Sequence, residues 1–261
     1  MSTLIIHPSR ILTTISDYLV NDDAILSRIA YERGALERLS TLVHCITPPD
    51  LNEREEDEPE SMSALREVRL DPLNYHRTYR VFQAALTAIA SLAMFENDIR
   101  QAVADEMKLL PIIEIALSHR HIGVRYAACQ CIRAISRGIA VLRTNLVDTG
   151  IGMLVFGILK KEDEDRRVLS AALSAVCNIV NDFSPLKQVS TARIFNRAEF
   201  MSKVQVYIDE GLLPRLMQLI ECGEPTLRLS ALWAIKNVLT RSSRAVKQSV
   251  IDTIGWPQLF Q

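Results

Sequence analysis

The sequence has little glycine, few aromatic residues and no excess charge of either sign. Nine of its 261 residues are glycine and 6% are aromatic, whereas leucine, alanine and isoleucine are plentiful. This balance favours helices over a β-sandwich. The formal net charge of −1 argues against a nucleic-acid partner, because nucleic-acid binding usually needs a basic excess. No apolar run reaches the roughly 18 residues of a membrane-spanning helix, so we also expect no membrane partner.

The N-terminus lacks a basic segment followed by a continuous apolar stretch, so we expect no signal peptide. The five cysteines are an odd number and lie mostly inside apolar helical patterns, which is typical of a reducing compartment. We therefore expect the protein in the cytoplasm and nucleus. The apolar fraction of 48% is normal for a folded core.

Motifs for catalysis and metal binding are missing. The sequence contains no phosphate-binding glycine loop, no HExxH and no GxSxG. Cys129 and Cys131 would point to different sides of a helix, so we expect buried thiols there. His119 and His121 have no third ligand nearby and are expected in a loop between helices. We predict a protein that is not an enzyme and has no metal, cofactor or small-molecule substrate.

Internal repetition is the strongest positive signal. Four segments carry apolar residues at steps of three and four, as helices with one buried side do. They align, roughly 43, 44 and 59 residues apart, on the alanines Ala85, Ala128, Ala172 and Ala231. In the last segment, LRLSALWAIKNVLT, the predicted buried side consists of Leu229, Leu232, Ile235, Val238 and Leu239. In this alignment, Leu232 matches Leu86, Cys129 and Leu173.

A second series of apolar segments precedes these helices. It begins at Gly34, Lys108, Gly150 and Gly211, and again near Ile254. Each unit is then a short helix, a second helix and a long third helix, which resembles the armadillo repeat rather than the two-helix HEAT repeat. We expect an all-α fold: a right-handed superhelical solenoid of armadillo repeats, about four plus a partial fifth, with residues 1–261 forming one domain.

Two stretches interrupt the periodicity. Residues 47–72 are acidic, contain proline and have no period, which predicts a disordered insertion. Residues 184–198 form a second insertion, and residues 8–20 are interpreted as a lead-in helix. Residues 242–261 begin a fifth unit and stop inside its second helix, without the polar cap that an end unit needs. From this we expect either a truncated chain or another chain covering this end.

In such a solenoid the third helices line a concave groove, which here would bind a partner. The residues predicted to face it are Trp233, Lys236, Asn237 and Thr240, with Asn178 in the third repeat and Tyr126, Gln130, Arg133 and Arg137 in the second. An asparagine amide both donates and accepts, so it can hold a peptide backbone, and tryptophan is favoured at binding hot spots. The cations and the absence of carboxylates predict an acidic or carboxylate-bearing peptide tail.

Each of these residues also has a structural interpretation. Trp233 can be a core residue between repeats, and Asn178 and Asn237 can bond neighbouring backbone. Arg133 and Arg137 can belong to an ordinary solvated face. The sequence leaves these alternatives open.

Three stretches carry a more specific resemblance. They are RYAACQCIRAISRGIAVLRTNLVD (125–148), VCNIVNDFSPLK (176–187) and LRLSALWAIKNVL (227–239). Together they resemble the armadillo-repeat subunits of GID/CTLH E3 ubiquitin ligases. The resemblance implies a non-catalytic scaffold that links a substrate receptor to the RING-bearing ligase scaffold for proteasome-dependent degradation. It also implies that the groove holds the receptor's tail, chiefly at Trp233 and Asn237.

An importin-like armadillo protein that binds cargo peptides is the alternative. Trp233 and Asn237 match the Trp-x-x-x-Asn pair of such carriers, which occurs there in successive repeats with acids nearby. Here Ser174 stands where the tryptophan before Asn178 would be, and the predicted groove is basic. We therefore favour the ubiquitin-ligase scaffold.

Overall fold

The structure is a computed structural model that describes residues 24–46, 72–138, 140–181, 207–240 and 244–255. Within these ranges all regular structure is helical and there is no strand. The predicted lead-in helix at 8–20 and the second insertion at 184–198 lie outside the described residues. The same holds for the acidic insertion, except that Pro72 is the first residue of a helix.

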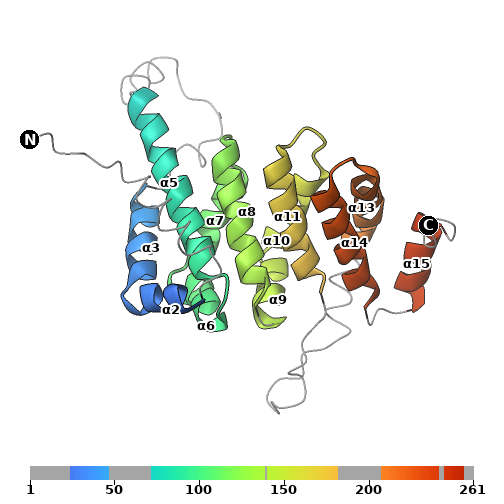
Figure 1. Ribbon diagram of the computed structural model, residues 1–261, viewed down its shortest axis with the longest axis horizontal. Helices are drawn as coiled ribbons and strands as arrows, with labels where there is room; N and C mark the ends of the chain where they lie inside the picture. Colours follow the sequence, from blue (N-terminus) through green and yellow to red (C-terminus); the bar gives the residue numbers. More distant parts are fainter. Residues whose placement is uncertain (1–23, 47–71, 139, 182–206, 241–243, 256–261) are drawn as a thin grey trace, which may run out of the picture. The chain divides into compact units, whose positions relative to one another are not determined.

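Three helices are described in each of the first three repeats, and the described part of the fourth repeat contains its second and third helices (Figure 1). The helices are α2 (Ala24–Glu32), α3 (Ala35–Ile46), α5 (Pro72–Leu92), α6 (Asn97–Gln101), the π-helical η2 (Ala102–Glu106), α7 (Leu110–Leu117), α8 (Ile122–Ser136), α9 (Ala140–Asp148), α10 (Ile151–Lys160), α11 (Arg166–Ile179), α13 (Leu212–Glu221), α14 (Pro225–Leu239) and α15 (Arg244–Ile254). The third helices of the four repeats are α5, α8, α11 and α14. Their aligned alanines are fully buried: Ala85, Ala128, Ala172 and Ala231.

A residue with left-handed backbone precedes each second helix. Gly34, Gly150 and Gly211 lie directly before α3, α10 and α13 with φ of 76°, 80° and 94°. Glycine adopts this conformation without a Cβ clash, which explains why it recurs at the start of the second series. Before α7 the left-handed residue is Lys108, with φ of 51°, so one repeat makes the same turn with a non-glycine residue.

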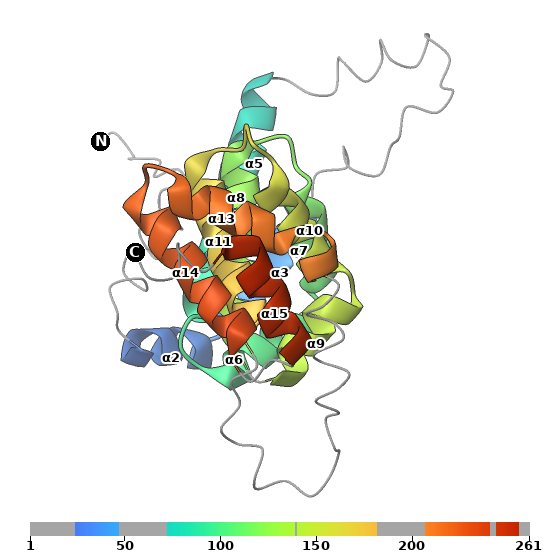
Figure 2. The same ribbon diagram turned by 90° about the vertical axis from the view of Figure 1, so that its right-hand side faces the viewer.

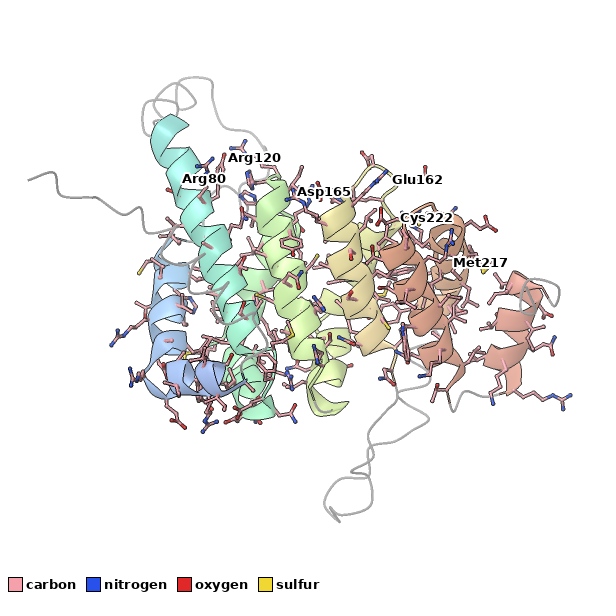
Figure 3. All side chains as sticks on the ribbon, viewed as in Figure 1. Arg80, Arg120, Glu162, Asp165, Met217 and Cys222 are labelled. Atoms are coloured by element: carbon pink, nitrogen blue, oxygen red, sulfur yellow. The ribbon has the colours of Figure 1, made fainter. Side chains whose placement is uncertain are left out.

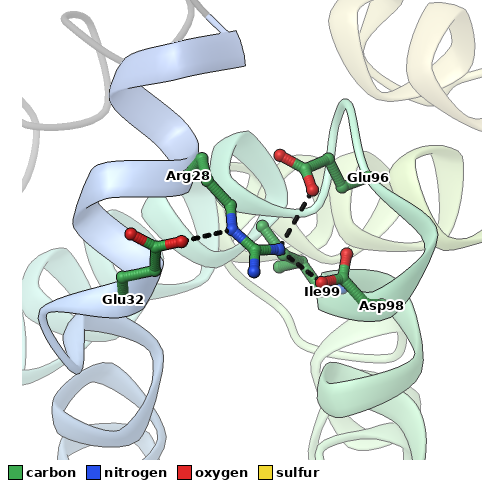
Figure 4. A network of polar contacts seen from close by, with 5 residues as sticks. All are labelled: Arg28, Glu32, Glu96, Asp98 and Ile99. Carbon is green, nitrogen blue, oxygen red and sulfur yellow. Dashed lines mark hydrogen bonds and ion pairs between the residues drawn. The ribbon is translucent and has the colours of Figure 1, made fainter.

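The chain divides into two compact units, residues 1–134 and 135–261, and each is described by itself. In the first unit α2 and α3 both pack on α5. Arg28 of α2 donates to Glu32 in its own helix and to Glu96 and Asp98, the residues around the start of α6 (Figure 4). These exposed ion pairs are individually weak, but together they hold α2 against the second repeat.

In the second unit α11 packs against α10 and α14, and α13 packs on α14. Glu162 and Asp165, between α10 and α11, lie at the same end of this unit as Cys222, between α13 and α14 (Figure 3). The third helices α11 and α14 therefore begin at one edge and run in the same direction. In the view of Figure 2, α14 and α15 are the helices of this unit nearest the viewer.

Arginine side chains satisfy carbonyls at helix ends. The last carbonyls of a helix have no partner within it, and a cation near a helix C-terminus is electrostatically favoured. The buried Arg100 donates to the carbonyls of Ala93 and Met94, which follow α5. In the second unit, Arg215 Nε donates to the Leu159 carbonyl at 2.7 Å and Arg228 Nε to the Ile220 carbonyl at 2.9 Å. These bonds fix the turns between successive helices.

The predicted buried side of α14 is partly wrong. Ile235 and Val238 are buried as expected, but Leu229 is 58% exposed and Leu232 is 48% exposed. The helix buries its alanine side, including Ala231, against its neighbours. Leu229 and Leu232 face away from that contact, and no described helix covers them fully.

Candidate peptide-binding surface

The predicted groove residues of the last repeat lie on α14, and Trp233 is the most accessible aromatic among them. Its side chain is 49% exposed, which rules out the alternative that Trp233 is a core residue between repeats. The Lys236 ammonium lies over the indole, with Nζ 4.0 Å from the ring centroid. This cation–π contact holds both side chains at the surface. At the end of the helix, Thr240 Oγ1 donates to the Lys236 carbonyl at 2.7 Å.

The Asn237 side chain is hydrogen-bonded to the preceding repeat. Its Nδ2 donates to the Cys177 carbonyl at 2.9 Å and lies 3.2 Å from Cys177 Sγ. Asn178 of α11 makes a comparable contact, because its Nδ2 donates to Ser136 Oγ at 3.3 Å. Both amides therefore link third helices to each other, as the structural interpretation of the sequence anticipated.

Burial raises the pKa of the Cys177 thiol to about 11, although the hydrogen bond from Asn237 and the nearby Lys236 charge oppose the shift. The thiol is therefore protonated near neutral pH and is a poor nucleophile. Cys129 and Cys131 are buried, as predicted, and burial also raises the pKa of Cys131.

On α8, in the first unit, the predicted residues form one hydrogen-bonded row. Gln130 Nε2 donates to Tyr126 Oη at 2.9 Å, and Arg133 Nη1 donates to Gln130 Oε1 at 3.2 Å. All three side chains are half-buried, whereas Arg137, just after the helix, is exposed and belongs to the second unit. The row presents a phenol, an amide and a guanidinium in fixed order along one side of α8.

The histidines lie where the sequence expected, between α7 and α8. His119 is buried, and the ring of His121 lies 4.6 Å from that of Tyr79. Among the described side chains, no three His, Cys, Asp or Glu gather as metal ligands. None of the described helices has the length and apolarity needed to cross a bilayer.

Sequence reasoning missed two kinds of residue in this surface. The first kind is the hydrogen-bond acceptor of each asparagine. Ser136 lies 42 residues before Asn178, and Cys177 lies 60 residues before Asn237. No local sequence pattern marks either acceptor. Leu232 was missed as a surface residue because its spacing is that of a buried position. Only the neighbouring helices decide these roles.

Comparison with known proteins agrees with this geometry. The armadillo/beta-catenin-like repeat matches residues 203–240, and the HEAT repeat matches residues 109–139, which contain the helix pair α7 and α8. Among solved structures, a designed armadillo repeat protein in complex with the peptide (KR)4 superposes with a TM-score of 0.64 at 20% identity, over 97% of this chain and 82% of that one. The armadillo repeats only protein of Plasmodium falciparum gives 0.54 at 13% identity, over 91% and 86%. The fold is that of an armadillo-repeat protein, as predicted.

The relatives in sequence are more specific. The chain is 25% identical to GID complex subunit 5 of Schizosaccharomyces pombe over 243 residues, which are 93% of this chain and 28% of the relative. It is 26% identical to armadillo repeat-containing protein 8 of Danio rerio over 203 residues, 78% of this chain and 27% of the relative. The predicted resemblance is thereby confirmed. The chain spans little more than a quarter of the length of these curated relatives.

Proposed function

We propose that this chain is a non-catalytic scaffold of a GID/CTLH-type ubiquitin ligase and that it binds the tail of a substrate-receptor subunit. The similarity to a protein named as a GID complex subunit supports the complex. The half-exposed indole of Trp233, held by Lys236, supports the tail site. In this proposal the scaffold connects the receptor to the RING-bearing subunits, and the other subunits carry out ubiquitin transfer.

The tail is proposed to be acidic or to end in a free carboxylate. Lys236 and Arg137 are exposed cations of the second unit, and in the first unit the Arg133 guanidinium is oriented by Gln130. A carboxylate gains from such donors. Because the Asn237 amide is engaged by Cys177, we assign the anchoring contact to Trp233 and Lys236 and a supporting role to Asn237. The anchoring contacts proposed here lie on α14 of the second unit, and Tyr126, Gln130 and Arg133 are further candidate residues on α8 of the first unit.

Fluorescence anisotropy with two labelled acidic peptides, one with a free C-terminus and one amidated, tests the tail site. We expect the free acid to bind more tightly. Trp233→Ala should weaken its binding by about tenfold or more, as hot-spot residues do. Leu154→Ala is a matched control, because Leu154 lies on α10 and is 37% exposed. Unchanged binding by Trp233→Ala would refute the anchor.

Affinity purification of the full protein from its own cells tests the complex. Recovery of RING, CTLH and receptor subunits is expected. Recovery of an importin-β-type carrier, together with tighter binding of basic than acidic peptides, would instead establish the importin-like alternative. That alternative is weakened because Asn178 and Asn237 already bond within the chain.

A further inference from the structure

The half-buried row on α8, which consists of Tyr126, Gln130 and Arg133, has a fixed hydrogen-bond polarity. A guanidinium can only donate, so the contact of Arg133 Nη1 with Gln130 Oε1 at 3.2 Å identifies the amide oxygen. The amide nitrogen of Gln130 then lies toward Tyr126 and donates to its Oη at 2.9 Å. The orientation of the Gln130 amide is therefore determined by its two neighbours.

This polarity decides which hydrogen bonds the row can still make. The amide oxygen of Gln130 and the phenol oxygen of Tyr126 each already accept a hydrogen bond. Within the described residues, the phenol O–H of Tyr126 and the second amide N–H of Gln130 have no acceptor. The two donor atoms lie 2.9 Å apart, so both can reach the oxygens of one ligand group. The row therefore suits a ligand that accepts hydrogen bonds.

The charges of the first unit favour an anionic acceptor. Helices α5 and α8 lie against each other, because Cys131 Sγ donates to the Leu86 carbonyl at 3.1 Å. Together they contain four arginines and no aspartate or glutamate, whereas each other described helix of this unit contains at least one of these acids. An anion at α8 meets the Arg133 charge and no carboxylate from either third helix. A basic side chain would meet donors and like charge.

We propose that Tyr126 and Gln130 bind the side-chain carboxylate of an aspartate or glutamate in the partner peptide, with Arg133 supplying the countercharge. This inference rests on the proposed function, because it takes α8 as part of the partner-binding surface. It goes further by assigning the α8 row a ligand group of its own. That group lies within the peptide and needs neither a free C-terminus nor the anchor at Trp233 and Lys236.

A carboxylate suits this row better than a phosphate does. A phosphorylated side chain carries nearly two negative charges at neutral pH and is typically recognised by a cluster of arginines. The row contains one cation, Arg133, beside two neutral donors. Arg125, the other arginine of α8, donates to the carbonyls of His119 and Arg120, both at 2.8 Å, in the turn before the helix. One cation and two neutral donors match a single negative charge.

Capped decapeptides are the probes, because an acetylated N-terminus and an amidated C-terminus leave the central side chain as the only charge. Four peptides differ only in that residue, which is glutamate, glutamine, lysine or phosphoserine. Each is titrated into the isotope-labelled full chain, and NMR follows the Gln130 side-chain amide and the backbone amides of residues 126–133. We expect saturable shifts with the glutamate peptide at a Kd of about 1 mM, and binding of the glutamine and lysine peptides weaker by about tenfold or more.

Two nearly isosteric variants locate the contact. Gln130→Glu replaces the amide donor by an acceptor that still pairs with Arg133, so it should weaken binding of the glutamate peptide by about tenfold or more. Tyr126→Phe removes only the hydroxyl and should weaken it by about threefold or more. Ser174→Ala is the matched control, because Ser174 aligns with Gln130 but donates to the Ser170 carbonyl of its own helix at 2.9 Å. It should leave binding unchanged, and circular dichroism melting should show that all three variants fold.

Four results would overturn the carboxylate site. They are the absence of saturable shifts with the glutamate peptide, equal binding of the glutamate and glutamine peptides, unchanged binding in Gln130→Glu, and tighter binding of phosphoserine than of glutamate. The last result would make phosphate the ligand group of the α8 row.

The experiment also separates this site from the tail anchor. The capped peptides have no terminal carboxylate, and Trp233 belongs to the second unit. Trp233→Ala should therefore leave the shifts at α8 unchanged, and their loss in this variant would overturn the independence of the α8 site. If Trp233→Ala leaves binding of the free-acid tail peptide unchanged while the glutamate peptide still shifts Gln130, the anchor on α14 fails and the α8 site stands.

Discussion

The two third helices of the second unit, α11 and α14, show how similar sequences acquire different surfaces. Ala172 and Ala231 occupy one aligned position and both are fully buried, whereas Leu173 is fully buried and Leu232 is 48% exposed. Helix α11 packs against α10 and α14, and α14 packs mainly against α11 and α13. The different burial of Leu173 and Leu232 shows that the repeat pattern determines which residue types recur, whereas the neighbouring helices determine which of them are buried.

The polar positions differ in the same way. Cys177 on α11 aligns with Lys236 on α14. The thiol lies beneath the Asn237 amide, and the ammonium lies over an exposed indole. The covered helix thus carries a protonated, unreactive group where the less covered helix carries a charge. This contrast leads to four predictions.

The largest expected effect is the difference between the two leucines. Leu173→Ala should lower the free energy of unfolding by about 3 kcal/mol, the usual cost of a cavity in a packed core. Leu232→Ala should lower it by less than about 1 kcal/mol, because the side chain is half in water. Urea denaturation of the two variants measures both. Equal losses would show that α14 is covered as α11 is.

The Cys177 thiol should make stability fall at alkaline pH. An unfolded thiol ionises near pH 9 and the folded one near 11, because burial raises its pKa. Between these values the folded state holds more protons, so this contribution is present below pH 9 and lost as pH rises to 11. The loss should be about 1–2 kcal/mol. Stability is measured against pH for the wild type and for Cys177→Ala. The difference between the two curves isolates the contribution of Cys177, because the other buried titratable groups are present in both proteins. Identical curves would contradict the assignment.

Removing the Asn237 amide should cost about 1 kcal/mol, because its hydrogen bond to the Cys177 carbonyl joins the two helices. The matched control is Lys236→Ala, one residue away and exposed, which should change stability by less than about 0.5 kcal/mol. Thermal and urea unfolding of both variants compare them. If Asn237→Ala were neutral and still reduced tail binding, Asn237 would be a direct ligand rather than a support.

Of the four predictions, the one at Trp233 has the smallest expected effect on stability, apart from the control variants. Trp233→Ala removes a half-exposed ring and its contact with Lys236, so the free energy of unfolding should fall by about 0.5 kcal/mol. A loss of several kcal/mol in urea titration would mean that the indole belongs to the core. In that case the comparison between a covered α11 and an accessible α14 would fail.

Much of the fold followed from local patterns. The apolar spacing of 3.6 residues located all four third helices, and the recurring glycines marked the turns before the second helices. The positions of Trp233 on the surface and of Cys131 in the core also followed from spacing. The functions of Asn178 and Asn237 did not, because an amide can bond a peptide or a neighbouring helix equally well.

The amino-acid sequence by itself determined that this protein is a stack of helical repeats, since helical periodicity is a property of residues only a few positions apart. It also determined the likeness to GID/CTLH subunits, which rests on residue identity along the chain. Tertiary structure alone decided that Asn237 meets Cys177 and that Leu232 is half-exposed. Both depend on whether a distant segment packs against the helix, and the spacing of residues within the helix carries no information about that segment.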